Sequence, residues 1–181
     1  AWVQLDVWAA DTGALAVRVA AVDVRRVLEE ATATATPQAA EKGLRIELAL
    51  PPQLPPVEAD PYRLRLVLRH LLDNAIKFTD AGHVRVWTEL EERACGETAL
   101  RMVVWDTGIG IHPDDHERIF DTFFRADGAA TRRHGGAGLG LAISRRLAAL
   151  MRGTIGFSST PGEGSAFWVA LPCAMTAATD G

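Results

Sequence analysis

Apolar residues recur through residues 60–78 at the spacing of a helix that buries one face. They lie three and four positions apart, as Leu64, Val67, Leu68, Leu71, Leu72, Ala75 and Ile76. Asp60-Pro61 predicts the helix start, because the carboxylate can accept hydrogen bonds from free N–H groups and proline loses no bond at the first helical position. We therefore expect an amphipathic helix from Asp60 to about Phe78.

A polar stripe on this helix is the first candidate for chemistry. His70, Asn74 and Lys77 lie four and three residues apart, so they stack on one face. An imidazole, an amide and an amine held side by side can serve a hydrated divalent cation and a phosphate chain. Asn74 is the only asparagine of the chain, and Lys77 is one of two lysines among 19 basic residues. Such a stripe alone is more often a solvated helix face, so its meaning depends on the motifs that follow.

The rest of the chain alternates between helical and period-two patterns. Two more helices are predicted, from Asp23 to about Glu41 with a kink or break at Pro37, and over residues 138–151. The predicted strands cover residues 15–20, 44–50, 84–90, 98–105, 154–159 and 165–171.

Between these elements lie two connections of different kinds. Residues 51–56 form a proline-rich connector, whereas residues 112–137 form a long irregular region, with one short helix at 114–120, that is typical of a functional lid. Strands in adjacent pairs with few βαβ crossovers predict an α+β two-layer sandwich instead of a doubly wound sheet.

Composition narrows the class of protein. A chain of 181 residues that is 48% hydrophobic and 23% charged can bury the core of one domain. A net charge of −4 argues against a dedicated nucleic-acid binder. No apolar run approaches the roughly 18 residues that a membrane-spanning helix needs. Cys95 and Cys173 match no metal or redox spacing, which suits a reducing cytoplasm.

Two glycine-bearing segments add candidate chemistry. Asp106-Thr107-Gly108-Ile109-Gly110 leaves a strand and enters a loop, where a carboxylate can accept from an exocyclic amine such as that of adenine and would repel the carbonyl of guanine. Its glycines let the backbone approach a flat ring. The run from Gly135 to Leu141 opens a helix, and its unobstructed N–H groups suit a polyphosphate. Taken singly, the first motif is more often a simple turn, and the second is equally a flexible hinge before a helix.

Phe120-Asp121-Thr122-Phe123-Phe124-Arg125 lies between these two loops. Its phenylalanines can anchor one end of the lid, and Arg125 can then reach a phosphate. The alternative is a small hydrophobic staple beside solvated arginines, which we prefer for Arg132 and Arg133.

Together these motifs resemble the ATP-binding catalytic domain of bacterial sensor histidine kinases, in the class shared with gyrase, Hsp90 and MutL ATPases. The resemblance covers about residues 22–172. The segments that resemble the N, G1, F and G2 boxes and the final glycine box are 70–79, 106–110, 120–125, 136–141 and 162–167. The resemblance implies a Bergerat fold, in which about three helices cover a mixed, mostly antiparallel sheet beside a long ATP lid.

The resemblance also implies a role for each matched position. Asn74 would hold Mg²⁺ against the phosphates, Lys77 would contact phosphate, and Asp106 would accept from the adenine amine. The residues expected at the nucleotide are Asn74, Lys77, Phe78, Asp106, Gly108, Ile109, Gly110, Phe124, Gly136, Gly138, Leu139, Gly140 and Leu141.

The expected catalytic residues are His70, Asn74, Lys77 and Arg125. Arg125 would approach the terminal phosphate. His70 stands where ATP-hydrolysing relatives carry a glutamate general base. A histidine there favours phosphoryl transfer to a protein over attack by an activated water.

Parts outside this chain are implied as well. Residues 1–14 resemble the end of a dimerisation-type helix, residues 15–172 the ATP-binding domain, and residues 173–181 a flexible tail. Since residues 1–12 hold no histidine, the phosphoacceptor is expected on a dimerisation domain absent from this chain. The chain alone should bind ATP and Mg²⁺ but autophosphorylate little or not at all.

The expected parent is a homodimer that is cytoplasmic or anchored in the inner membrane, with a response regulator downstream. We expect this chain itself to contact neither nucleic acid nor membrane. Three other interpretations compete: a nucleotide-binding regulatory module, a serine kinase of the anti-sigma type, and an ATPase of the gyrase or MutL type. His70 opposes the last of these.

Overall fold

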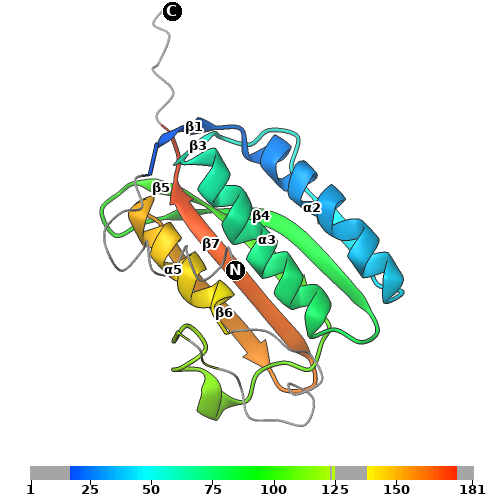
Figure 1. Cartoon of the computed structure of the whole chain (residues 1–181). Coiled ribbons are helices and arrows are strands. Elements are labelled where there is room, and N and C mark those ends of the chain that lie inside the picture. The colour runs from blue at the N-terminus through cyan, green and yellow to red at the C-terminus, as the bar shows by residue number, and fades with distance from the viewer. Residues whose placement is uncertain (1–16, 123, 125–137, 175–181) are drawn as a thin grey trace, which may run out of the picture.

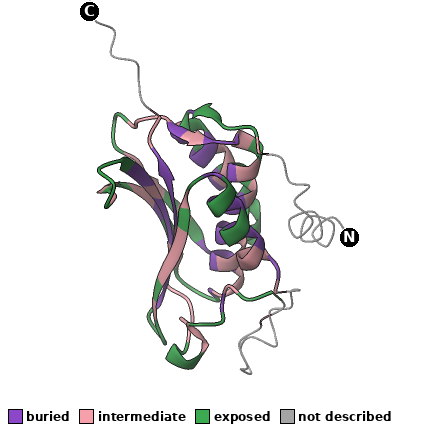
Figure 2. Ribbon diagram, turned by 90° about the vertical axis from the view of Figure 1, so that its left-hand side faces the viewer, coloured by how far each residue is buried: buried purple, intermediate pink, exposed green. Residues whose placement is uncertain are grey.

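The computed structural model describes residues 17–122, 124 and 138–174, which form two layers. Helices lie on one face of a sheet, with the buried residues between the layers (Figures 1 and 2). The elements in chain order are β1 (Ala20–Val22), α2 (Val24–Glu41), β2 (Arg45–Ala49), β3 (Val57–Ala59), α3 (Pro61–Lys77), β4 (His83–Glu92), β5 (Thr98–Asp106), the 3-10 turn η1 (Pro113–Asp115), α5 (Gly140–Leu150), β6 (Thr154–Thr160) and β7 (Gly164–Pro172).

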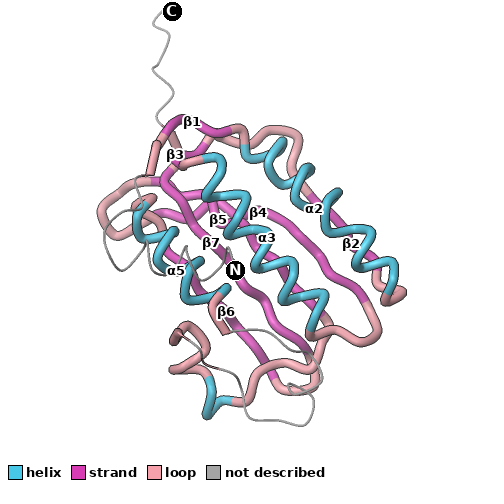
Figure 3. Tube along the Cα trace, in the orientation of Figure 1, coloured by secondary structure: helices cyan, strands magenta, loops and turns pink. Residues whose placement is uncertain are grey.

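The main sheet has five strands in the order β2-β4-β5-β7-β6. Only β2 and β4 pair in parallel, and their connection runs through α3, as a parallel pair requires. The β4–β5, β5–β7 and β6–β7 pairs are antiparallel. In Figure 3 the helices α2, α3 and α5 lie across this sheet. The predicted α+β sandwich with a mixed, mostly antiparallel sheet is confirmed.

The predicted central helix is α3, and its start and buried face agree with the sequence pattern. The Asp60 carboxylate accepts hydrogen bonds from the N–H groups of Tyr62 and Arg63 at 3.0 and 3.2 Å. Such a cap stabilises a helix by about 1 kcal/mol. Every member of the predicted apolar stripe is buried, from Leu64 to Ile76. They pack against the inner residues of β4, β5 and β7, which alternate with outward ones as period two demands.

Of the kink or break expected at Pro37 in helix α2, the break was wrong. The helix continues through Pro37 to Glu41. Proline removes one backbone donor, but Ala35 and Ala39 on either side are buried against the core and hold the helix in place. The hydroxyl groups of Thr32, Thr34 and Thr36 each donate to the carbonyl four residues earlier, so the threonine-rich turn keeps its polar groups within the helix.

Three further predictions were wrong in extent. The first strand covers Ala20–Val22, whereas residues 17–19 of the predicted strand 15–20 lie before it, and residues 15 and 16 lie outside the described residues. This strand pairs with β3, a three-residue strand that the sequence pattern does not predict. The predicted helix at 114–120 is reduced to η1, followed by turns. Cys173 and Ala174, expected in the tail, bind back to β3 and Pro56 through an isolated bridge and a 2.8 Å hydrogen bond. Residues 1–14 and 175–181 lie outside the described residues.

Candidate nucleotide-binding site

The last two turns of α3 bring the predicted polar stripe to one end of the helix. Asn74 and Lys77 are both partly buried there. Within the described part of the chain, the structure records no hydrogen bond to the side-chain amide of Asn74. The Lys77 ammonium group lies 4.9 Å from the centre of the Phe78 ring. A cation is thus held next to an aromatic ring at the helix end, in the same turn of the helix as Asn74.

This end of α3 is joined directly to the loop that follows β5. The carbonyl of Phe78 accepts a hydrogen bond from the N–H of Ile109 at 3.2 Å. A Cβ atom at Gly108 would lie 2.3 Å from the same carbonyl oxygen, a separation that no side chain tolerates. The glycine therefore lets the two segments touch, and residues about 30 positions apart share one site.

Asp106 ends β5 and is the buried carboxylate of this site. Asp106 is only 4% exposed, and its Oδ1 atom accepts a hydrogen bond from the N–H of Gly108 at 2.8 Å. Burial raises the pKa of Asp106 to about 6, although hydrogen bonds from the backbone amides of Gly108 and Ser165 act to lower it. The carboxylate is therefore mostly ionised at pH 7 but poorly solvated, which makes it a strong acceptor for an amine.

The loop after Asp106 is held in place by the β6–β7 hairpin. Gly110 has a φ of +69°, and a Cβ there would lie 2.1 Å from the carbonyl oxygen of Thr160. The N–H of Gly162 donates to the carbonyl of Ile109 at 2.8 Å. The Ser159 hydroxyl accepts from the N–H of Ile111, also at 2.8 Å. These contacts tie the predicted G1 loop to the predicted final glycine box.

Helix α5 brings the second glycine motif to the same face of α3. Leu139 precedes the helix, and among the described residues no side chain caps its first N–H groups. A Cβ at Gly140 would lie 3.5 Å from the Cγ atom of His70. His70 is 9% exposed, and its Nδ1 atom lies 3.1 Å from the hydroxyl of the fully buried Ser144. The start of α5, with N–H groups suited to an anion, therefore lies against the polar stripe.

Of the remaining predicted site positions, four are described by the structure and two are not. Phe124 is partly buried against the core, with the guanidinium of Arg118 4.7 Å from its ring centre. Leu139 is buried and Leu141 packs on the core, so both support α5 from its inner side. Gly138 lies just before α5, with a φ of +67°. Arg125 and Gly136 lie outside the described residues.

Sequence reasoning missed the residues that hold these segments together. Thr79 is fully buried, donates to the carbonyl of Ala75 at 2.7 Å and supports Asp106. Ser144 and Ser159 have comparable roles at α5 and at the hairpin. Ser144 lies four residues after Gly140 and is buried beside Ile143, so helical periodicity is the signal that could have identified it. The partner of Ser159 lies 48 residues away, and no local pattern identifies it.

The donor groups present fit a magnesium ion that is carried by a polyphosphate. No group of three or more His, Cys, Asp or Glu side chains suited to a metal occurs among the described residues. Mg²⁺ in nucleotide sites keeps several waters and takes few protein ligands beside the phosphates. One amide oxygen, from Asn74, meets that requirement. A search of the described helices finds none with the length and apolar character to cross a membrane.

Known proteins with similar sequences indicate the family to which this chain belongs. The family described as "Histidine kinase-, DNA gyrase B-, and HSP90-like ATPase" matches residues 59–175. The sensor histidine kinase AruS of Pseudomonas aeruginosa is 45% identical over 157 residues, which are 84% of this chain and 15% of AruS. The signal transduction histidine-protein kinase BarA of Escherichia coli is 36% identical over 165 residues, 91% of this chain and 18% of BarA.

Among solved structures, full-length ShkA in complex with AMPPNP superimposes with a TM-score of 0.83 at 37% identity. The match covers 97% of this chain and 35% of ShkA. The chain thus spans less than one fifth of the length of the two curated relatives and about a third of ShkA. The family match includes α3, both glycine loops and the final hairpin, and two of the similar proteins named above are histidine kinases. The chain therefore belongs to the histidine kinase-, DNA gyrase B- and HSP90-like ATPase family, as an ATP-binding catalytic domain of the sensor histidine kinase type.

Proposed function

We propose that the chain binds ATP with Mg²⁺ and transfers the γ-phosphoryl group to a histidine on a dimerisation domain of the same parent protein. The observation that carries this proposal is the meeting of three segments at the end of α3. Phe78 bonds to Ile109 of the first glycine loop, and His70 contacts Gly140 at the start of α5. The similar protein ShkA was solved in complex with AMPPNP, which supports an adenine nucleotide at this place.

Each end of the site has a separate task in this proposal. The Asp106 carboxylate accepts from the exocyclic amine of adenine, and its buried position makes that hydrogen bond strong. The glycine loop tied down by Ser159 and Gly162 forms the surface on which the ring lies. Specificity for adenine follows, because guanine presents a carbonyl where the carboxylate needs a donor.

The phosphate end relies on α3 and α5. The amide oxygen of Asn74 binds the magnesium ion, which screens the charge of the phosphates when bound. Lys77 supplies a positive charge beside it, and the N–H groups at the start of α5 face the same region. Arg125 is proposed to approach the terminal phosphate, as its place in the F box implies.

His70 distinguishes phosphoryl transfer from hydrolysis in this proposal. A water nucleophile needs a general base near the γ-phosphate, and glutamate has that role in the hydrolysing relatives. Here the position holds an imidazole that is buried and engaged with Ser144. The chain therefore positions ATP for attack by the acceptor imidazole: the new N–P bond forms as the bond to the ADP oxygen breaks, and the acceptor nitrogen releases its proton.

The partners of this activity follow from the same proposal. The acceptor histidine belongs to a dimerisation domain, the parent is a homodimer, and a response regulator receives the phosphoryl group next. The names of AruS and BarA as sensor and signal transduction kinases support this arrangement.

A reconstitution experiment tests the proposed transfer. The chain is mixed with the dimerisation domain of its parent, Mg²⁺ and ATP labelled at the γ-phosphate. We expect label that is stable to alkali and labile to acid on the dimerisation domain, and almost none on the chain alone. The Asn74→Ala variant serves as the inactive control. Steady phosphate release by the chain alone, with no label on the acceptor, would instead identify a hydrolase.

A further inference from the structure

We propose that Lys42 is a positioning residue for the phosphate end of the site. Its ammonium group binds the last carbonyl groups of α3 and so sets where Asn74 and Lys77 lie. The role of those two residues rests on the proposed function, whereas the position of Lys42 rests on geometry alone.

The contacts of Lys42 reach across to another helix. Its Nζ atom donates to the carbonyl of Ile76 at 2.7 Å and to that of Lys77 at 3.1 Å. The carboxylate of Asp80 lies 3.7 Å away, and its side chain is largely exposed. The Lys42 side chain is only 30% exposed, so most of it is covered by protein. Lys42 and Lys77 are the two lysines of the chain, and one binds the backbone carbonyl of the other.

The end of α2 fixes the direction in which Lys42 points. Lys42 is the first residue after the helix, and the N–H groups of Gly43 and Leu44 donate back to Ala40 and Ala39, each at 2.9 Å. Gly43 has a φ of +69°, which an L side chain adopts only with strain. Leu44 is buried next to this turn. The turn is therefore rigid, and it fixes the backbone position from which the Lys42 side chain extends.

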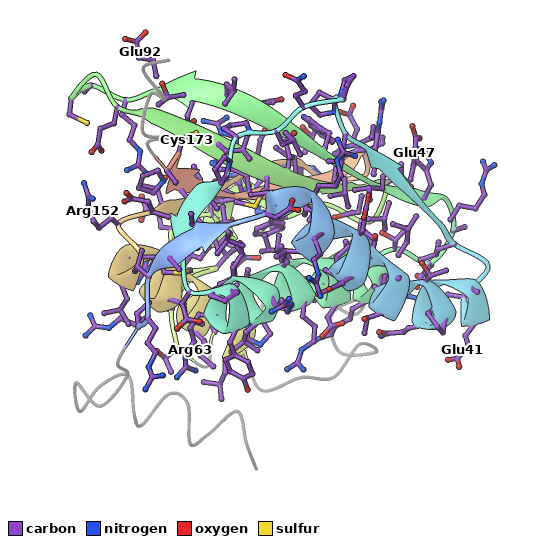
Figure 4. The ribbon with its side chains drawn as sticks, turned by 90° about the horizontal axis from the view of Figure 1, so that it is seen from above. Glu41, Glu47, Arg63, Glu92, Arg152 and Cys173 are labelled. Atoms are coloured by element: carbon purple, nitrogen blue, oxygen red, sulfur yellow. The ribbon has the colours of Figure 1, made fainter. Side chains whose placement is uncertain are left out.

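Helices α2 and α3 run side by side in the same direction. Figure 4 shows this with Arg63 at the start of α3 and Glu41 at the end of α2. Their C-terminal ends, which carry partial negative charge, therefore lie close together. A cation between the two ends lowers their repulsion and satisfies orphan carbonyl groups at the same time.

Lys42 completes the hydrogen bonding at the end of α3. Five consecutive carbonyl groups lie there, and each has a donor. The pairs are Asn74 with the Phe78 N–H, Ala75 with the Thr79 hydroxyl, Ile76 and Lys77 with Lys42, and Phe78 with the Ile109 N–H. Lys42 alone supplies two of the five, from a different helix. Without it, the last turn of α3 loses two of these hydrogen bonds and can fray.

Loss of Lys42 should affect the phosphate end of the nucleotide site more than the adenine end. Asn74 and Lys77 belong to the turn that Lys42 holds, so their positions depend on it. Asp106 belongs to β5 and is fixed by sheet pairing with β4 and β7. Loss of Lys42 should therefore weaken binding of the phosphates and magnesium more than binding of adenine.

The test compares Lys42→Met with Lys42→Arg, and with Asp80→Asn as a control that leaves both carbonyl bonds in place. Calorimetry measures the affinity for ADP with Mg²⁺ and with EDTA. For Lys42→Met we expect about a tenfold loss with Mg²⁺ and a ratio of the two affinities that falls toward one. Lys42→Arg should retain most of the wild-type ratio, and Asp80→Asn all of it. A wild-type ratio in Lys42→Met would overturn the proposal.

A second measurement does not depend on nucleotide. Hydrogen exchange of the Phe78 and Ile109 amides in the free chain should be about tenfold faster in Lys42→Met, and unchanged in Asp80→Asn. Should Lys42→Met not fold, Lys42→Ala, which also removes the donor to both carbonyl groups, is measured in the same way and should show the same faster exchange. If the wild type binds no nucleotide, the proposed function fails while this exchange still tests Lys42. Exchange that stays at the wild-type rate would contradict the role of Lys42.

Discussion

Asp106 sets the pH behaviour of the site at the scale of single residues. Its pKa is raised from 3.8 to about 6, mainly because burial disfavours the charged form. A carboxyl with a raised pKa in the folded state stabilises the fold fully below about 3.8 and loses this contribution as the pH rises through about 6. The free domain at pH 7 thus carries a cost of roughly 3 kcal/mol from this one group. In the proposed function, this ionised carboxylate is the acceptor for the adenine amine.

The first prediction concerns Asp106→Asn. At pH 7.5 the free variant should melt at a higher temperature than the wild type, since the poorly solvated charge is gone, and the gain should vanish toward pH 4. Its affinity for ADP should fall about 10- to 100-fold, because a charge-assisted hydrogen bond is lost. Thermal unfolding and calorimetry across the pH range measure both effects.

The phosphates of ADP also change their ionisation with pH. This effect is the same for the wild type and for Asp106→Asn, so it cancels when the two pH profiles of affinity are compared. Affinity of the wild type should rise as the pH rises through about 6, the pKa of Asp106, more steeply than that of the variant. Parallel pH profiles would show that Asp106 does not bind the nucleotide.

The second prediction concerns Asn74→Ala, which removes the proposed magnesium ligand. Nucleotide binding should lose its dependence on Mg²⁺, while thermal stability stays the same or rises slightly, because alanine is the better helix former. Calorimetry with and without Mg²⁺ gives the first quantity, and melting gives the second. Tyr62→Ala at the exposed far end of α3 is the matched control. Unchanged Mg²⁺ dependence in Asn74→Ala would remove the residue from the site.

At the scale of elements, the site depends on loops held at fixed distances from their neighbours. Gly110 and Gly162 both have positive φ values, +69° and +81°. They differ in surroundings: a Cβ at Gly110 would meet the Thr160 carbonyl at 2.1 Å, whereas a Cβ at Gly162 would meet nothing within 4 Å. The pair therefore separates backbone strain from close contact.

The third prediction uses this pair of glycines. Gly162→Ala should cost about 1 kcal/mol of unfolding free energy, from strain alone. Gly110→Ala should cost clearly more, about 3 kcal/mol or above, and should weaken adenine binding because the loop must move away from the hairpin. Urea unfolding and ADP titration of both variants give the comparison. Equal effects of the two substitutions would mean that the contact with Thr160 is unimportant.

Local sequence patterns predicted the long helices and strands better than the short segments and the contacts that depend on tertiary packing. The i, i+3, i+4 stripe located α3 and its buried face, because one long amphipathic helix records its burial in its own sequence. The same reasoning failed at Pro37, where tertiary packing outweighs the local cost of proline. The three-residue strand β3 is too short to show any period and exists only through its pairing with β1 and Cys173.

At the scale of the whole molecule, the site residues were predictable by type but the way they meet was not. Asn74, Asp106 and Gly108 stand out in the sequence because amide, carboxylate and glycine have distinct chemistry. The hydrogen bonds that bring their segments together join residues far apart in the chain, as from Lys42 to Ile76 and from Ile111 to Ser159. Such pairs are set by the fold, and a single sequence carries no local record of them.

We propose that α3, the loop after β5 and the start of α5 surround one adenine nucleotide with its magnesium ion. A crystal structure of the chain grown with AMPPNP and Mg²⁺ is the sharpest test of this arrangement. We predict the adenine amine about 3 Å from the Asp106 carboxylate and the metal about 2.1 Å from the amide oxygen of Asn74. A nucleotide bound elsewhere, or an adenine ring that leaves Asp106 without contact, would contradict the account.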